Sequence, residues 1–289
     1  MSAGRIAILI DGGFFLKRLP KLVAANRCDS PVDIVACLRR LCRQHIKTLT
    51  GDEGSRWHQH VYRIFFYDAV PYDGKAHHPI DNRIINFEKS DVARKRHELF
   101  ELLRKQRKLA LRLGKVTREH DWAIQPDITK KLLKTRQWVG ALQQLTPPTP
   151  DAGDTTLTLS PADVRSLIDL RDLWRTLDGG SVRLGLRQKG VDMRIGIDIS
   201  SLALKKQVDT IILVSGDSDF VPAAKLARRE GIEFILDPMW QQINADLFEH
   251  IDGLQSGFNN PGNTGQSSKG QQAAANASAP IPEQDVNGD

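Results

Sequence analysis

The sequence predicts an α/β fold: a doubly wound parallel sheet, flanked by helices, with a helical, basic insertion. Short continuous apolar runs, of which Ile6–Ile10 and Thr210–Ser215 are the clearest, are typical of strands buried on both faces. In the C-terminal third such runs alternate with helical patterns, which indicates parallel βαβ units. Turns rich in Asp and Gly follow the runs directly, as expected where a strand gives way to a crossover helix.

The bulk composition suits one large domain with an insertion. The chain has 289 residues, 40% of them hydrophobic, and its 41 Lys and Arg against 35 Asp and Glu give a net charge of +6. That balance mildly favours a polyanionic partner. Cys28, Cys37 and Cys42 form no paired framework, so we expect free thiols in a reducing compartment. Without a signal peptide or a run near the roughly 18 apolar residues of a membrane span, we expect a cytoplasmic protein with no membrane contact.

The N-terminal part predicts two buried strands separated by helices. The strands are Arg5–Ile10 and Tyr62–Tyr67, each closed by an aspartate. Between them, helical patterning covers Phe14–Asn26, with a break near Pro20, and then residues from Pro31 to about Thr48.

The middle of the chain is read as mainly helical and basic. Leu99, Leu102, Leu103, Leu109 and Leu113 predict one long helix between Pro79 and about Leu113. A strand near Lys115–Ile124 and a basic helix near Ile128–Val139 follow. Ser160 and Pro161 then predict a helix start, as N-cap and first helical residue.

The C-terminal third predicts a regular alternation of helices and strands. A helix opens at Asp198 and continues to about Lys206, and a strand over Thr210–Ser215 follows it. The next elements are a helix over Phe220–Glu230, stopped by Gly231, a strand over Ile232–Leu236 and a short helix over Ile243–Ile251.

These elements predict one domain over residues 1–252, with its core at about 5–70 and 185–252. The basic insertion covers about 72–180. Residues 253–289 contain almost no large apolar side chain and are expected to be a disordered polar tail.

Three aspartates follow two of the predicted strands. Asp11 ends the first, and Asp217 and Asp219 follow Thr210–Ser215. Ligands of open parallel sheets bind beyond the carboxyl ends of the strands, so these side chains converge if the strands are neighbours. Packed carboxylates need a neutralising cation, and an oxygen-only site suits Mg²⁺ or Mn²⁺. Such an ion activates water for phosphodiester hydrolysis.

Asp192 and Asp198 are two further candidates for the rim of this pocket. We expect Asp192 to precede a helix and Asp198 to lie at or near its start. The alternative for several of these acids is purely structural, because Asp198 and Asp219 stand where helix N-caps belong and Asp is a favoured cap. Caps do not explain why the acids gather on one edge, so the cation site is preferred for the group.

Three segments resemble the NYN domain family, a branch of the PIN-like nucleases that includes LabA-like bacterial proteins. They are Ile6–Gly13, then Lys189–Asp192 leading to Asp198, and Asp209–Pro222 with its Ser215-Gly216-Asp217-Ser218-Asp219 motif. The resemblance implies a PIN-like sheet and RNA cleavage with Mg²⁺ or Mn²⁺. It also implies that Asp11, Asp198, Asp217 and Asp219 are catalytic and bind the metal, with Asp192 as a further acid.

The match departs from the family in one place and leaves a large part of the chain unmatched. Many members carry Asn two residues after Asp-Gly, where this sequence has Gly13 followed by Phe14. A polar partner of the metal is therefore absent at this position. The region from about 72 to 180 has no counterpart in the minimal domain.

A run of basic residues lies between Lys89 and Arg118 and is opposed by few acids. A basic helix beside an acidic pocket would hold a nucleic-acid backbone, although a solvated helix face is an equal alternative. Trp122 and Trp138 could stack on unpaired bases, but core packing is the preferred interpretation. The predicted nucleic-acid-binding residues are Lys189, Arg94, Lys95, Arg96, Arg104, Lys105, Arg107 and Lys108.

The preferred function is a metal-dependent ribonuclease, most consistent with endonucleolytic cleavage of single-stranded RNA. The second hypothesis, favoured by Phe14, is a catalytically weak or inactive NYN-fold regulator that binds RNA or protein. A third is a metal-dependent phosphatase acting on small esters. The sequence is compatible with a homodimer but contains no feature that requires one.

Overall fold

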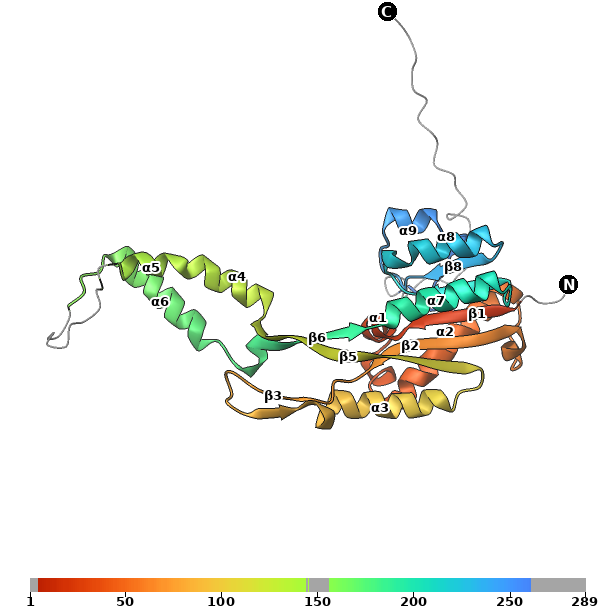
Figure 1. The fold of residues 1–289 in the computed structure, drawn as a ribbon, viewed down its shortest axis with the longest axis horizontal. Helices are drawn as coiled ribbons and strands as arrows, with labels where there is room; N and C mark the ends of the chain where they lie inside the picture. Colours follow the sequence, from red (N-terminus) through yellow and green to blue (C-terminus); the bar gives the residue numbers. More distant parts are fainter. Residues whose placement is uncertain (1–4, 144, 146–155, 261–289) are drawn as a thin grey trace, which may run out of the picture.

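The computed structural model describes residues 5–143, 145 and 156–260. A seven-stranded sheet runs through its centre in the order β6-β5-β2-β1-β7-β8-β9 (Figure 1). Every neighbouring pair is parallel except β5 and β6. The strands are β1 (Ile6–Asp11), β2 (Val61–Val70), β5 (Leu109–Ile124), β6 (Val182–Lys189), β7 (Thr210–Val214), β8 (Glu233–Asp237) and β9 (Gly253–Leu254). The predicted α/β class, a mostly parallel sheet flanked by helices, is confirmed and is consistent with a PIN-like fold.

Helices cover both faces of the sheet and create two separate cores. In β1, Ile8 and Ile10 pack into one core, while Ala7 and Leu9 pack into the other. All four are fully buried, which explains why the strand is a continuous apolar run. One face is covered by α1 (Gly12–Arg18), α2 (Pro31–Thr50) and α3 (Asp91–Arg104), and the other by α7 (Val191–Leu204), α8 (Val221–Arg229) and α9 (Ala245–Glu249).

Local capping explains where several helices begin and end. The Ser30 side chain accepts from the Asp33 backbone N–H at the start of α2, and Gly51 ends that helix in the left-handed region at φ 71°. The helix start predicted at Ser160 and Pro161 is confirmed, because Ser160 and Asp163 form a capping box at the start of α6 (Pro161–Arg175).

The long helix predicted between Pro79 and about Leu113 is wrong. The segment contains part of a small antiparallel hairpin, β3 (Lys75–His77) and β4 (Ile84–Asn86), then α3 and the beginning of β5. Leu109, Leu111 and Leu113 all face the same core as α3. Their spacing of two is that of a strand, and it was mistaken for the continuation of a helical pattern.

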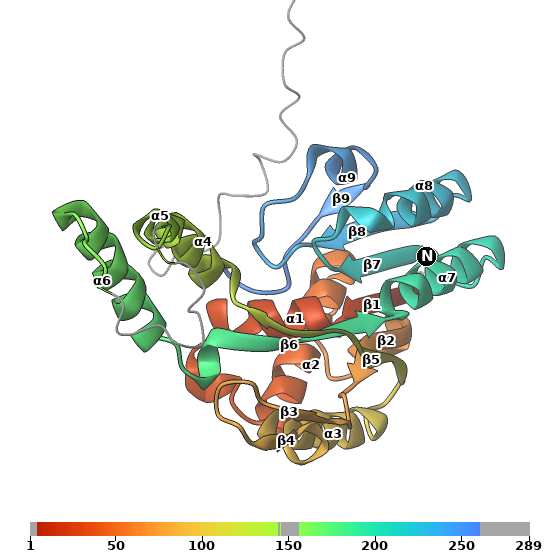
Figure 2. The same cartoon turned by 60° about the vertical axis from the view of Figure 1, so that its left-hand side comes forward.

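β5 is much longer than the strand expected near Lys115–Ile124, and its outer half forms an arm. Its last pairing with β2 joins Lys115 to Val70, and from there it pairs with β6 alone. This ribbon leads to α4 (Pro126–Lys134), α5 (Trp138–Ala141) and α6, which lie clear of the sheet (Figures 1 and 2). The expected insertion of about 72–180 is therefore divided. Its α3 and inner β5 belong to the core, and only the remainder projects.

The disordered tail predicted from residue 253 is wrong for residues 253–260. β9 pairs with β8, and Phe258 is buried against α2. The Asp237 carboxylate holds this segment by accepting from the Gly257 N–H at 2.9 Å and from Ser256 Oγ at 3.0 Å. Residues 261–289 lie outside the described residues. The three cysteines are free thiols as expected, and no helix among the described residues is long and apolar enough to span a membrane.

Candidate active site

Asp11 and the loop carrying Asp217 and Asp219 leave neighbouring strands at the same edge of the sheet. Ile10 of β1 lies beside Val214 of β7 in parallel register, so the residues that follow them emerge side by side. The Ser215 hydroxyl accepts from the Asp217 N–H at 3.3 Å, and Asp217 Oδ1 accepts from the Asp219 N–H at 3.0 Å. The predicted adjacency of the two strands is therefore confirmed.

Asp192 reaches this edge from α7, in a position that differs from the expectation. The helix begins at Val191 and not at Asp198, so Asp192 lies in its first turn and Asp198 near its middle. Gly190 precedes the helix with φ 76°, a conformation that favours glycine. α7 runs antiparallel to β1 and β7, so its N-terminus lies at the carboxyl ends of these two strands.

Asp11 carries the strongest electrostatic signature of the site. Its Oδ1 accepts from the Phe14 N–H at 3.1 Å, which makes it the N-cap of α1. Burial raises the pKa of Asp11 from 3.8 to about 6, and the charges of Asp192 and Asp68 add to this rise, against the lowering effect of backbone hydrogen bonds from Phe14 and Gly13. An acid with this pKa is ionised at neutral pH, but the two backbone hydrogen bonds do not offset the cost of burying its negative charge.

The remaining acids of the edge repel one another. Desolvation raises the pKa of Asp192, and the negative charges of Asp217 and Asp219 raise it further. Asp11, Asp192, Asp217 and Asp219 are thus linked electrostatically, although they come from three separate segments of the chain. None of the four forms an ion pair with any residue that the structure describes.

This donor set fits a hard divalent cation by chemistry and by charge. All four groups offer carboxylate oxygen, the ligand that Mg²⁺ and Mn²⁺ prefer. The four acids do not form a tight cage. Among the described residues, three ligand atoms that lie within 4.8 Å of one another are found only in a different part of the chain. Mg²⁺ commonly keeps several waters and uses one or two carboxylates, so a looser arrangement is compatible with it.

Asp198, also predicted to be a catalytic ligand, is not brought to this group. Its Oδ2 accepts from the Tyr67 hydroxyl at 2.9 Å and from Arg112 Nε at 3.1 Å. Burial and the neighbouring carboxylate raise the pKa of Tyr67, so the phenol stays a donor. Asp198 thus lies over the face of the sheet, below the edge where the other four gather.

Asp68 is a further acid near the edge that the candidate set omitted. It lies near the carboxyl end of β2, is 3% exposed, and forms an ion pair with Arg96 of α3. Burial raises the pKa of Asp68, and the Arg96 guanidinium opposes that rise. Its position after a buried apolar strand, like that of Asp11, was the signal in the sequence.

Phe14 and Gln188 occupy the surroundings of Asp11. Phe14 packs its ring against Gly216, where an added Cβ would lie 2.9 Å from it. A Cβ at Gly13 would lie 3.4 Å from Asp11 Oδ1 and 3.7 Å from Gln188 Oε1. The β6 side chain of Gln188 therefore lies beside Gly13, the second residue after the acid, and no local sequence pattern indicated it.

The predicted basic residues divide between two opposite edges of the sheet. At the carboxyl edge, Lys189 pairs with Glu119 at 2.7 Å and Arg94 with Asp91 at 2.7 Å, while Arg96 is committed to Asp68. Lys95, on the same turn of α3, is exposed. These residues are on the side of the acids.

The other four predicted residues lie at the amino edge. Arg104 and Lys105 end α3, and Arg107 and Lys108 lead into β5. Lys108 Nζ donates to His58 O at 2.9 Å and to Val61 O at the start of β2. The expectation that this basic segment lies beside the acidic pocket is wrong for these four, because α3 runs the full length of the sheet between them.

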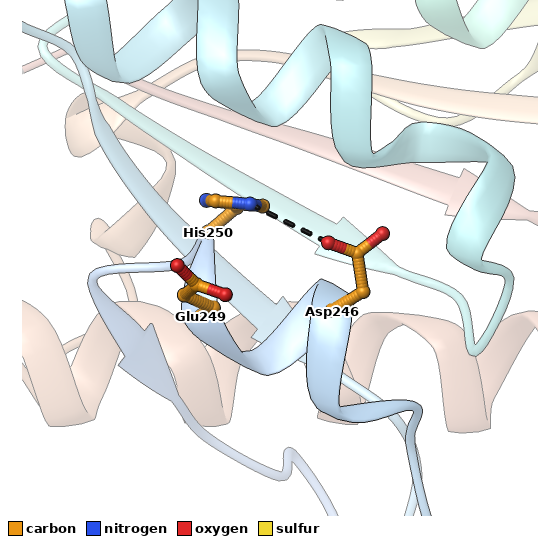
Figure 3. Close-up of side chains that lie close together, drawn as sticks. All are labelled: Asp246, Glu249 and His250. Atoms are coloured by element: carbon orange, nitrogen blue, oxygen red, sulfur yellow. Dashed lines mark ion pairs between the residues drawn. The ribbon is translucent and has the colours of Figure 1, made fainter.

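The three convergent ligand atoms mentioned above belong to Asp246, Glu249 and His250 of α9 (Figure 3). His250 Nε2 lies 3.5 Å from an Asp246 oxygen. Asp246 and Glu249 are exposed, and the helix has only five residues. The cluster is separate from the strand-end acids.

Comparisons with known proteins bear on part of the chain. No curated protein matches it. Among solved structures, a crystal structure of a protein of unknown function from Vibrio parahaemolyticus matches with 13% identity and a TM-score of 0.38, covering 89% of this chain and 96% of that one; a likeness this weak carries no functional argument. The model of the NYN domain matches residues 170–250, and this match supports the NYN family for the segment that carries Asp192, Asp198, Asp217 and Asp219.

Proposed function

We propose that this protein is a metal-dependent ribonuclease that hydrolyses phosphodiester bonds of single-stranded RNA. The observation that carries the proposal is the set of four aspartates that form no ion pair with the described residues, gathered from three segments at the carboxyl edge, where the neighbouring carboxylates help to raise the pKa of Asp11 and of Asp192. The NYN match points in the same direction, since that family suggests a PIN-like nuclease. Its LabA-like branch stays a prediction.

In this proposal Asp11, Asp192, Asp217 and Asp219 hold Mg²⁺ or Mn²⁺, which when bound activates water and stabilises the charge that develops on the phosphate. Asp11 supplies an ionised oxygen once the pH exceeds its pKa of about 6. The Asp217 carboxylate is oriented by the Asp219 N–H. Asp198 stays a predicted ligand, and in the structure its contacts suit a residue that positions α7 through Tyr67 and Arg112.

RNA is proposed as the substrate because basic side chains flank the acids on one side. Lys189 and Arg187 both approach Glu119, at 2.7 and 3.5 Å, so two cations share one acid at the base of the arm. The excess positive charge there suits a phosphate chain that must approach four negative carboxylates.

The test is cleavage of labelled single-stranded RNA by the wild-type protein and by the double variant Asp217→Asn, Asp219→Asn, with Mg²⁺ or Mn²⁺. Asp246→Asn is the matched control, since it removes an exposed carboxylate from a different cluster. We expect cation-dependent cleavage by the wild type and the control, and a loss of at least about a hundred-fold in the double variant. Cleavage that survives in a folded double variant would overturn the assigned site.

A second candidate is an NYN-fold regulator that binds RNA without cleaving it. The spacing of the acids and the presence of Phe14 favour it, because both leave the cation with fewer fixed ligands. Binding without cleavage by the wild-type protein would support this candidate. Hydrolysis of a small phosphate ester without RNA cleavage would instead favour a phosphatase.

A further inference from the structure

The arm contains an apolar cavity that the proposed cleavage site does not use. Its volume is about 430 Å³, and it lies between the β3–β4 loop, the outer ends of β5 and β6, and the last turn of α6. Two tryptophans line it together with aliphatic side chains. The principal lining residues are Ile80, Trp122, Ile124, Trp174, Leu177 and Val182.

Hydrogen bonds and ring contacts hold the walls of this cavity in place. His78 Nε2 lies 3.1 Å from Gly179 O, and the His78 ring meets the Trp122 ring edge-on with centroids 4.6 Å apart. The Gln125 N–H donates to Ser181 O at 2.9 Å, which joins the end of β5 to the start of β6. The cavity is therefore preformed in the arm, so a ligand that binds there would lose little free energy to ordering the cavity walls.

The cavity presents uncovered aromatic surface next to cations. Trp174 is 56% exposed and Ile80 is 40% exposed, so apolar atoms at the mouth are open to water. Arg175, the chain neighbour of Trp174 in α6, forms no ion pair with residues the structure describes. Over the described residues from 115 to 189, twelve Lys and Arg stand against seven Asp and Glu, a difference of +5.

The cavity is also connected to the candidate active site by a single strand. β6 runs from Val182 at the cavity to Gln188, whose side chain lies beside Gly13 at the start of α1. At about 3.3 Å per residue, this length of strand spans roughly 20 Å. One end of β6 therefore lies at the cavity, and the other lies at the candidate active site, where the RNA backbone would be cleaved.

We infer that this cavity binds one unpaired base of the RNA strand whose backbone is cleaved at the strand-end acids. The flat apolar face of the base would stack with Trp174 and Trp122, and Arg175 would contact an adjoining phosphate. Base–aromatic stacking accepts any base, so the cavity selects single-stranded over paired RNA and not a particular sequence. The inference rests on the proposed function for its substrate, while its test does not require cleavage.

The test measures binding of a single-stranded RNA of about ten nucleotides, within the usual range for such surfaces, in EDTA so that no cleavage occurs. Trp174→Ala is expected to weaken binding about ten-fold, and Trp174→Phe to keep most of the affinity. Phe248→Ala is the matched control, since Phe248 is an aromatic side chain with 58% exposure on α9. It is expected to bind as the wild type does.

Two further measurements distinguish base stacking from its alternatives. An abasic oligonucleotide of the same length keeps the phosphates but removes the bases, so it should bind the wild type and Trp174→Ala equally. Photo-crosslinking of a 4-thiouridine RNA to the wild type should label the cavity residues, a readout that is independent of any variant's folding.

Equal RNA affinity of folded Trp174→Ala and wild type, or crosslinks confined to other segments, would overturn the inference. A change in sedimentation of the Trp174→Ala variant with unchanged RNA affinity would assign the cavity to self-association, which also overturns it. If the wild type cleaves no RNA while Trp174→Ala loses affinity, the base pocket stands and the nuclease proposal fails.

Discussion

Asp11 is both a helix cap and an acid of the candidate active site. Its side chain accepts the Phe14 N–H at the start of α1, which is a stabilising contact. The same side chain is desolvated and lies near Asp192 and Asp68, which makes its charge costly. The cost is what a site for a cation requires, since the binding of a positive ion relieves it.

This conflict predicts a stability effect with a defined pH dependence. Because the folded-state pKa of Asp11, about 6, exceeds its usual value of 3.8, the stability that its protonated form contributes is present below about pH 4 and is lost as the pH rises through 6. Asp11→Asn keeps the cap acceptor and removes the charge. In EDTA it should therefore exceed the wild type in unfolding free energy at pH 7.5, by at most about 3 kcal/mol.

Urea denaturation at pH 4 and pH 7.5 measures this difference. The two proteins should have nearly equal unfolding free energies at the lower pH, and added Mg²⁺ should stabilise only the wild type at the higher pH. A gain in stability that is the same at both pH values would show that the charge of Asp11 is not its source.

Among the helices, α7 decides which acids can act together. Asp192 and Asp198 are six residues apart, so they differ by about 9 Å along the axis and by about 240° around it. Asp192 therefore faces the strand ends from the first turn, while Asp198 faces Tyr67 and Arg112. The sequence placed the start of α7 too late. β6 ends at Lys189 and α7 begins at Val191, so only Gly190 separates them, and Gly190 has no side chain that could mark a helix start as an N-cap.

This geometry predicts unequal effects for two conservative substitutions in α7. Asp192→Asn should weaken the apparent affinity for Mg²⁺ or Mn²⁺ by about ten-fold or more, since it removes a charge that interacts with Asp11, Asp217 and Asp219. Asp198→Asn should change that affinity by less than about three-fold, because Arg112 already neutralises Asp198.

Cation-dependent thermal stabilisation gives both affinities without relying on turnover. Circular dichroism before each titration checks that the variant retains the helical content of the wild type. A larger loss of cation affinity in Asp198→Asn than in Asp192→Asn would show that Asp198 is a ligand and imply that α7 moves when the cation binds.

At the scale of the whole molecule, the arm and the two sheet edges determine where RNA can approach. The ribbon of β5 and β6 continues past the carboxyl edge and carries its helices away from the sheet (Figure 2). Arg187 and Lys189 lie at its base near the acids, whereas Arg104, Lys105 and Arg107 lie at the amino edge. Arg94–Arg96 and Arg104–Lys108, which belong to one continuous basic stretch of sequence, likewise end up at opposite edges of the sheet.

The contribution of each edge to RNA binding can be separated by charge removal. The double variant Arg187→Gln, Lys189→Gln should bind single-stranded RNA more weakly, with a salt slope reduced by roughly 1.4 for two lost phosphate contacts. The triple variant Arg104→Gln, Lys105→Gln, Arg107→Gln should stay within about two-fold of the wild-type affinity.

Fluorescence anisotropy over a range of salt concentrations gives both quantities. The amino-edge triple variant removes more charge than the double variant, so it also controls for the effect of net charge alone. A greater loss of affinity in the triple variant would place the RNA at the amino edge, away from the acids.

The sequence by itself determined the parallel α/β core and three of the four gathered acids. Ile6–Ile10 and Ile211–Val214 are apolar at every position, and only strands buried on both faces need such runs. The carboxyl ends of parallel strands share one edge, so Asp11, Asp217 and Asp219 followed from strand adjacency without knowledge of any contact. These conclusions rest on hydrophobic patterns that can be recognised from consecutive residues alone.

Only the tertiary structure decided which charges are compensated and what the middle of the chain builds. Arg112 neutralises Asp198 across 86 residues of sequence, and Arg96 neutralises Asp68, so neither acid is left to the group at the edge. The long-range pairing of β5 with β2 and β6 turned an apparent helix into a central strand and an arm. Pairings between distant segments depend on which surfaces meet after the core packs, and local sequence patterns contain no record of that choice.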